Sequence, residues 1–217
     1  LGGLCAKSGD GWWHAYQHGI GIIGHTAPLA FIHKFNHVYI ASSYTCDFPV
    51  ICASDPVIDS HINIADTEVK HDGYFMNRVD KVKFIVDTCE RMKNIILRVC
   101  WISTGGHNCC NCEKCIRTIF NILSVGGNPN QYGFILDSSL ESQMLKVVSK
   151  CLATVPFQRP QWHDIQDYIV SHDSFSKKND PNYNWIYSID IDKSCPKPSI
   201  FKRIVRKLKR IVRKIIK

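Results

Sequence analysis

The sequence lacks the features of a membrane-spanning or exported protein. No stretch of about eighteen consecutive apolar residues is present, which excludes an ordinary transmembrane helix. No basic segment followed by an apolar run and a small-residue cleavage site is found, so a signal peptide is not indicated. The chain has eleven cysteines, an odd number, and without an export signal they favour a reducing compartment. We therefore expect a cytoplasmic protein.

A recognisable phosphate-binding loop is also missing. Residues 8–11 read Ser-Gly-Asp-Gly, but they match neither the Walker pattern nor an SGGxDS loop, and no apolar strand precedes them. We interpret this segment as an ordinary loop. The chain begins with Leu1 rather than methionine, which predicts a fragment or a processed product.

Acidic residues are absent from the carboxyl end, where the basic charge is concentrated. Residues 200–217 contain nine lysines and arginines, and removing these cations from the formal net charge of +8 leaves −1 for residues 1–199. The apolar residues of this segment form one stripe of helical spacing, which predicts a basic amphipathic helix. Such helices are typical of proteins that lie on an anionic membrane surface, here the inner face of the membrane. A nucleic-acid-binding arm and a packing or homo-oligomer helix are the alternatives.

The clearest candidate site is a cysteine-rich loop, residues 100–115, which holds five of the eleven cysteines. Cys109, Cys112 and Cys115 follow CxxCxxC spacing, and Cys100 lies nine positions before the first of them. Four thiolates so placed can close a tetrahedral shell around Zn²⁺. A closed shell leaves no position for water, so we expect a structural zinc rather than a catalytic one.

Other interpretations of this loop remain open. CxxCxxC spacing also occurs in iron–sulfur proteins, and the cysteines also fit a disulfide framework or unrelated buried thiols. Cys110 breaks the spacing and is interpreted as a bystander, whereas His107 is an alternative ligand.

The hydrophobic pattern predicts an α/β arrangement in the first half of the chain. We expect a helix over residues 12–34, broken near Gly24 and Pro28. His37–Ala41 reads as a short buried strand, and residues 62–69 read as another. Asn77, with Asp80 three residues later, predicts a capped helix. Residues 95–99 form the clearest strand and lead directly into Cys100.

The second half is predicted to be rich in helices. Ile116, Ile119, Phe120 and Leu123 recur at helical spacing after the cysteines. Ser138 with Glu141 predicts a capping box at the start of a further helix. Another helix is expected over residues 161–170, after Pro160.

Polar side chains after the first strand suggest a ligand mouth. Ser42 and Ser43 follow His37–Ala41, and α/β folds bind ligands just past the carboxyl ends of strands. Asp55 is a further candidate, because it lies in the irregular chain that follows. A plain serine-rich turn is the alternative.

The cysteine segment resembles a known family. Arg98-Val-Cys-Trp101 and Asn108-Cys-Cys-Asn-Cys-Glu-Lys-Cys-Ile-Arg-Thr118 look like the zinc segment of the 7-cyano-7-deazaguanine synthases (QueC) and their relatives. These are PP-loop ATPases of the adenine nucleotide alpha-hydrolase-like branch of the Rossmann-like HUP folds. The zinc pattern of the family, C-x8-C-x2-C-x2-C, falls here on Cys100, Cys109, Cys112 and Cys115. The likeness covers residues 14–125, with only the cysteine segment specific.

The resemblance implies an enzyme that adenylates a carboxylate with ATP and forms an amide or nitrile from ammonia. In that family the SGGxDS loop precedes the segment seen here, so the resemblance implies the carboxyl-terminal part of a QueC-like ligase or amidotransferase-like enzyme, inactive alone. Its substrate would be a small molecule bound by the full-length protein, and ATP would bind only with the missing segment present. A non-catalytic zinc-stabilised module, attached to a membrane surface or nucleic acid by residues 200–217, is the alternative.

These interpretations give an expected organisation for the whole chain. The fold class is α/β, with a Rossmann-like (HUP) three-layer core truncated at its amino end, a four-cysteine zinc loop, an α-rich carboxyl-terminal extension and a basic amphipathic tail helix. The expected segments are a partial core over 1–127, a helical extension over 128–173, a linker over 174–199 and the tail helix over 200–217.

Overall fold

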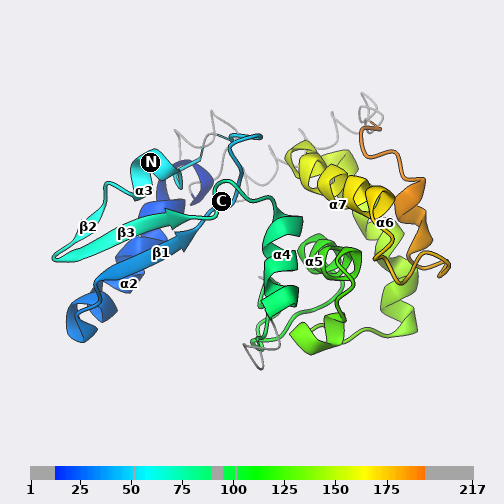
Figure 1. The fold of residues 1–217 in the computed structure, drawn as a ribbon, viewed down its shortest axis with the longest axis horizontal. Coiled ribbons are helices and arrows are strands. Elements are labelled where there is room, and N and C mark those ends of the chain that lie inside the picture. The colour runs from blue at the N-terminus through cyan, green and yellow to red at the C-terminus, as the bar shows by residue number, and fades with distance from the viewer. Residues whose placement is uncertain (1–12, 51, 89–94, 101, 194–217) are drawn as a thin grey trace, which may run out of the picture. The chain divides into compact units, whose positions relative to one another are not determined.

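The computed structural model shows a mixed α/β protein that divides into two compact units between Asp87 and Thr88 (Figure 1). The residues that it describes are 13–50, 52–88, 95–100 and 102–193. Roughly half of them are helical, and the described strands form one three-stranded sheet. The predicted α/β class is therefore confirmed. The observed division lies forty residues before the predicted one at residue 127, because the cysteine loop clusters with the helices that follow it.

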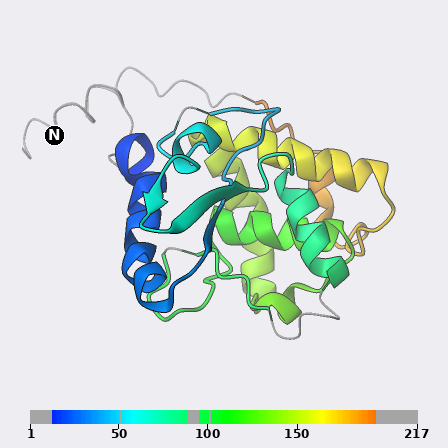
Figure 2. The same ribbon diagram turned by 60° about the vertical axis from the view of Figure 1, so that its left-hand side comes forward.

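The first unit is built around a short sheet in the order β1–β3–β2 (Figure 2). β1 (His37–Ala41) runs parallel to β3 (Thr67–Asp72), with Ile40 opposite His71. β2 (Asn63–Ile64) pairs antiparallel with the start of β3. The predicted strand at His37–Ala41 is confirmed, whereas the strand expected over residues 62–69 is a hairpin. Valine, tyrosine and isoleucine dominate β1, as is usual for a strand with one buried face.

Helix α2 (His18–His33) covers one face of this sheet and lies behind the strands in Figure 1. Its Ile23 packs against Ile40 of β1 and Val69 of β3, and these three side chains form the core of the unit. The break expected near Gly24 and Pro28 is not present. A proline fits the φ angle of a helix and removes one backbone hydrogen bond, so neighbouring turns can carry the helix through it.

Two further helices complete the first unit. α3 (Pro56–Asp59) is a single turn, and the Asp55 carboxylate caps it by accepting a hydrogen bond from the Val57 N–H at 2.9 Å. α4 (Arg78–Thr88) begins with the predicted capping box. The Asn77 side chain accepts from the Asp80 N–H at 2.9 Å, and the Asp80 carboxylate accepts from the Asn77 N–H at 3.1 Å. The sequence signal for this helix start is confirmed.

The second unit is helical and is organised around α5 (Glu113–Ser124), which packs against both α6 (Ser138–Thr154) and α7 (Arg159–Ser171). Every residue of α5 from Cys115 to Ser124 is buried, including the polar ones. A helix that is buried on all sides must satisfy its polar side chains internally. The Thr118 hydroxyl, for example, donates to the Lys114 carbonyl at 2.8 Å, and the Ser124 hydroxyl donates to the Asn121 carbonyl at 2.8 Å.

Helix α6 starts at the expected residue but with a different cap. The Asp137 carboxylate, one residue before the predicted Ser138, accepts from the Leu140 N–H at 2.8 Å. Glu141, the expected second member of the capping box, instead accepts from the Tyr183 hydroxyl at 2.6 Å. The predicted capping box is thus wrong, because Asp137 already supplies the oxygen that the first turn needs.

Residues 174–193, expected to belong to a linker, contribute to the core of the second unit. The Phe120 ring of α5 lies 4.8 Å from the Trp185 ring and 6.1 Å from the Phe175 ring, measured between centroids. Tyr183 and Ile186 are completely buried. Large aromatic side chains bury enough area to fix an otherwise polar segment. The tail helix predicted for residues 200–217 lies outside the described residues.

Candidate metal centre

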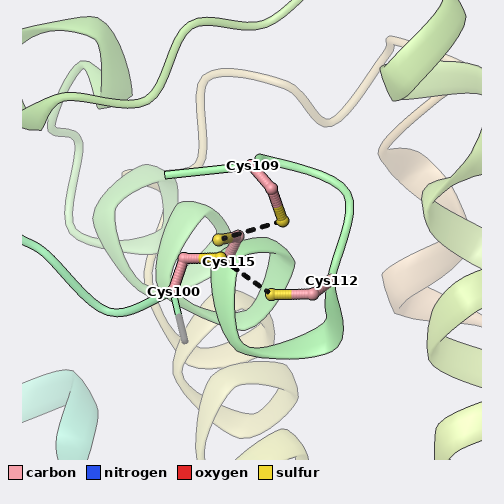
Figure 3. A group of neighbouring side chains, drawn as sticks. All are labelled: Cys100, Cys109, Cys112 and Cys115. Atoms are coloured by element: carbon pink, nitrogen blue, oxygen red, sulfur yellow. Dashed lines mark hydrogen bonds between the residues drawn. The ribbon is translucent and has the colours of Figure 1, made fainter. Parts of the chain in front are cut away.

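Four cysteine sulfurs converge at the start of α5, where they can hold a single metal ion (Figure 3). The Sγ atoms of Cys100, Cys109, Cys112 and Cys115 all lie within 4.8 Å of one another. Cys109 and Cys115 are 3.9 Å apart, and Cys112 and Cys100 are 4.0 Å apart. A ZnS₄ tetrahedron with Zn–S bonds of about 2.3 Å has sulfur–sulfur edges of about 3.8 Å. The predicted ligand set therefore has the dimensions of a tetrahedral site.

Cys100 reaches the centre from an extended segment rather than from a strand. Residues 95–100 form no regular strand, so that prediction is wrong. The Asn108 side chain takes the place of a neighbouring strand: its oxygen accepts from the Val99 N–H at 3.1 Å and from the Cys100 N–H at 3.3 Å. Its amide nitrogen donates to the Leu97 carbonyl at 2.8 Å and to the Gly133 carbonyl at 3.1 Å. One side chain thus fixes the approach of the first ligand.

The other ligands are positioned by the start of α5. Cys112 is the residue that precedes the helix, and Cys115 lies in its first turn. The helix dipole places partial positive charge at this end, which favours thiolates there. Cys110 has a left-handed backbone with φ +54°, and its buried thiol is directed to the Asn108 carbonyl. This turn separates Cys110 from the four ligands, as expected for a bystander.

The geometry bears on three alternatives for this loop: a disulfide, an iron–sulfur cluster and histidine ligation. The cysteines are free thiols, and the separation of 3.9 Å between Cys109 and Cys115 is far from the roughly 2.05 Å of a disulfide bond. A polynuclear iron–sulfur cluster binds its cysteines through different irons, which spreads the sulfurs further apart than one ion does. The His107 ring is exposed and packs beside Gly105. The site therefore fits one ion, such as zinc, held by four sulfurs.

Hydrogen bonds and burial give the four thiols of the cluster different pKa values. The side-chain bond with Cys115 lowers the pKa of the Cys112 thiol to about 5, and the same bond raises the pKa of Cys115. Burial raises the pKa of Cys109. Burial also opposes ionisation of Cys100, but backbone hydrogen bonds led by that of Ser103 lower its pKa overall. A metal ion would meet one thiolate already formed and would displace the remaining protons.

A buried network ties the cysteine loop to the helical core. Glu113, between two of the ligands in sequence, accepts from the Trp162 indole N–H of α7 at 2.9 Å. The same Glu113 oxygen lies 3.3 Å from the Arg117 guanidinium, and both side chains are less than one tenth exposed. Trp162 in turn packs edge-on against Phe120, with ring centroids 5.7 Å apart. The metal loop and the aromatic core are therefore in direct contact.

The residues expected at a ligand mouth lie on two loops of the first unit. Ser42, just past β1, is buried; its N–H donates to the Asp72 carbonyl at 2.8 Å and its hydroxyl donates to the Tyr44 carbonyl. Ser43 beside it is half-buried. Asp55 lies on the loop before α3, where capping occupies its carboxylate. The two serines therefore keep a position at the carboxyl end of a strand, whereas Asp55 has a structural role.

Two further features of the same unit are not marked by any sequence motif. Lys81 of α4 is half-buried, and its ammonium donates to the Ser42 carbonyl at 2.9 Å. Burial lowers the pKa of Lys81, and the nearby Arg78 lowers it further. The second feature is a buried pair, Asp59 and His71, joined at 2.9 Å. Neither Lys81 nor the Asp59–His71 pair belongs to a motif with fixed spacing. The position of His71 near the end of a strand is the one sequence signal for the pair.

Comparison with known proteins gives no relative for this chain. No protein-family model, no curated protein and no solved structure matches it. Among the helices that the structure describes, none combines the length and apolar character needed to cross a membrane.

Proposed function

We propose that this chain is the carboxyl-terminal part of an ATP-dependent ligase similar to the 7-cyano-7-deazaguanine synthases, with a zinc ion that holds its structure. The observation that supports the proposal is that the sulfurs of Cys100, Cys109, Cys112 and Cys115, spaced as in that family, lie within 4.8 Å of one another. With four sulfur ligands, zinc has no open position for water or substrate. Its role would be to clip the segment before the loop to the start of α5.

The carboxyl end of the parallel strand pair supports a ligand site in the first unit. Ser42 and Ser43 follow β1, and the Lys81 ammonium reaches the Ser42 carbonyl. Ligands of open α/β sheets bind outside the carboxyl ends of parallel strands. A half-buried ammonium at this edge suits an anionic ligand such as a carboxylate or a phosphate. The Rossmann-like three-layer core belongs to the same proposal, since two parallel strands are the part of such a sheet present in the first unit.

The proposal is tested by extending the chain. The DNA upstream of the codon for Leu1 should encode, in frame, an apolar strand followed by an SGGxDS loop. The extended protein should release pyrophosphate from ATP when it is given ammonia and a carboxylic acid substrate. Lys81→Ala should reduce this activity, whereas Lys83→Ala, two residues along the same helix, should not. An upstream sequence without such a loop, or an extended protein that never cleaves ATP, would refute the ligase assignment.

A second function is supported by the charge of the carboxyl end. Nine cations and no acid in residues 200–217 suit a zinc-stabilised module that binds an anionic membrane surface. The chain should then sediment with vesicles of phosphatidylserine and phosphatidylcholine but not with phosphatidylcholine alone. Binding should weaken with salt and disappear when residues 200–217 are deleted. Equal binding of the deleted chain would exclude this function, and preferential binding of RNA would identify the tail as a nucleic-acid arm.

A further inference from the structure

The first unit contains a buried polar cluster centred on Asp59, the last residue of α3. The Asp59 side chain is completely buried, and the His71 side chain of β3 is only 2% exposed. One Asp59 oxygen, Oδ2, lies 2.9 Å from His71 Nδ1 and accepts from the Ser54 hydroxyl at 2.7 Å. A titratable pair in so small a core is expensive unless it is well paired or has a function.

The backbone is shaped to make room for this cluster. Gly19 of α2 donates its N–H to the Ala53 carbonyl at 3.0 Å, which brings α2 against the loop before α3. A Cβ atom at Gly19 would lie 2.0 Å from Asp59 Oδ1 and 2.6 Å from the Ala53 oxygen. Only glycine permits this approach. The burial of Asp59 therefore follows from the way that α2, α3 and β3 come together.

Two polar atoms of the cluster have no hydrogen-bond partner in the described part of the protein. They are Asp59 Oδ1 and His71 Nε2, and both are buried. Nearly all buried polar atoms in folded proteins are paired, so an unpaired one calls for an explanation such as a ligand or a proton-transfer role. The two nitrogens of an imidazole lie on different sides of the ring, so His71 Nε2 faces away from Asp59.

The carboxylate fixes which nitrogen of His71 carries the proton. An ionised carboxylate only accepts hydrogen bonds, so Nδ1 must be the donor to Asp59. In the neutral ring, Nε2 is then an acceptor with a free lone pair. The hydrogen bond to Asp59 therefore places the lone pair of a neutral ring on Nε2.

The position of His71 in the sheet is suited to ligand chemistry. It lies opposite Ile40 of the parallel strand β1 and one residue before the end of β3. The same edge of the sheet carries Ser42, the residue that follows β1. Open α/β sheets bind ligands outside the carboxyl ends of their parallel strands.

We propose that His71 is a proton-accepting residue and that Asp59 is the positioning residue that holds it in the Nδ1–H tautomer. The substrate class rests on the proposed function: a protic nitrogen nucleophile, ammonia, attacking an adenylated carboxylate. The carbon–nitrogen bond forms as the carbon–oxygen bond to AMP breaks, AMP leaves with the electron pair, and the proton lost by nitrogen passes to His71 Nε2. A general base of this kind typically contributes about 10²–10⁴-fold to the rate.

The tautomer can be measured on the chain as it exists, without substrate. In protein labelled with ¹⁵N-histidine, two-bond nitrogen–proton spectra show which ring nitrogen of each histidine carries a proton. The signals of His71 are assigned by their loss in His71→Gln and, independently, by contacts with the neighbouring Tyr74 ring. We expect a neutral His71 with a protonated Nδ1 and a bare Nε2. Asp59→Asn should shift this ring toward the Nε2–H tautomer, whereas Asp66→Asn, in the exposed β2–β3 turn, should leave it unchanged.

Each outcome bears on one part of the proposal. A proton on Nε2 of wild-type His71, alone or together with one on Nδ1, would overturn it, because the acceptor would not exist. If the tautomer is as expected and the extended protein is active, His71→Gln should lower kcat about 10²–10⁴-fold with little change in the KM for ATP. An unchanged kcat would restrict the pair to a structural role. An extended protein without ATP-dependent activity would refute the ligase assignment and the ammonia step, while the spectrum would still establish His71 as an oriented acceptor.

Discussion

Removal of the metal should unfold or loosen the second unit, and the size of the effect follows from the chain length that the ion closes. Binding through Cys100 and Cys115 links residues fifteen positions apart, as a disulfide at the same positions would. A cross-link over about 15 residues stabilises a protein by about 3 kcal/mol through the restricted unfolded chain. Mass action gives a similar figure, about 4 kcal/mol when free zinc is 1,000-fold above its Kd.

Such a loss should be easy to measure. For a protein of this size, about 3 kcal/mol corresponds to a fall in Tm of about 6–12 °C. The assay is thermal unfolding by circular dichroism, with metal content determined in parallel, before and after treatment with a chelator. Cys112→Ser should lose the metal and show the same fall without chelator. Cys46→Ser, which removes an exposed thiol of the first unit, serves as the matched control and should keep both metal and Tm.

Two results would contradict this reasoning. If the chelated protein loses its metal but keeps its Tm, the ion does not hold the second unit together. If Cys112→Ser retains one metal ion per chain, the four sulfurs are not its ligands. The absorption of a cobalt-substituted protein separates these cases, because tetrahedral thiolate coordination gives intense visible bands that Cys112→Ser should alter and Cys46→Ser should not.

Three further predictions concern single contacts. Asn108→Ala removes four hydrogen bonds, three to residues 97–100 and one to Gly133, and should lower the free energy of unfolding by about 2–4 kcal/mol in urea titrations. A change near zero would show that Asn108 does not bridge these segments. Gly19→Ala should lower the free energy of unfolding by about 2–3 kcal/mol, because the added Cβ clashes with Asp59. In the control Gly24→Ala the added Cβ meets nothing within 4 Å, so this variant should raise the free energy of unfolding by about 1 kcal/mol. Equal effects of the two substitutions would contradict the close approach at Gly19. In the metal-free protein the pKa of Cys112 is lowered to about 5, so its thiolate persists below neutral pH and is lost only as the pH falls through that value. Alkylation of Cys112 by iodoacetamide, located by peptide mass spectrometry, should therefore continue at about pH 6, where Cys115, whose pKa is raised by the same hydrogen bond, should not react. Equally slow reaction of the two thiols would contradict this arrangement.

The sequence predicted the local features of the fold well and the long-range ones poorly. The strand His37–Ala41, the capping box at Asn77 and the buried stripe of α5 depend on neighbouring residues, and all three are confirmed. Residues 95–99 have the composition of a strand, but a side-chain amide from Asn108 occupies the place of a partner strand. The burial of the aromatic residues of 174–193 could not be predicted from their polar segment, because it depends on contacts with Phe120, more than fifty positions earlier.

The difference between local and long-range contacts also separates the cysteine site from the Asp59–His71 pair. Three of the four sulfurs lie within seven consecutive residues, so their spacing alone predicts that they can share one ion. Asp59 and His71 are twelve positions apart and are joined only because the β2–β3 hairpin turns the chain back toward α3. Gly19, which makes their burial possible, comes forty residues before Asp59, at a helix position where glycine ordinarily lowers stability. A glycine that is unfavourable for the helix alone is therefore explained by the tertiary structure, because the absence of a Cβ atom leaves room for the buried carboxylate.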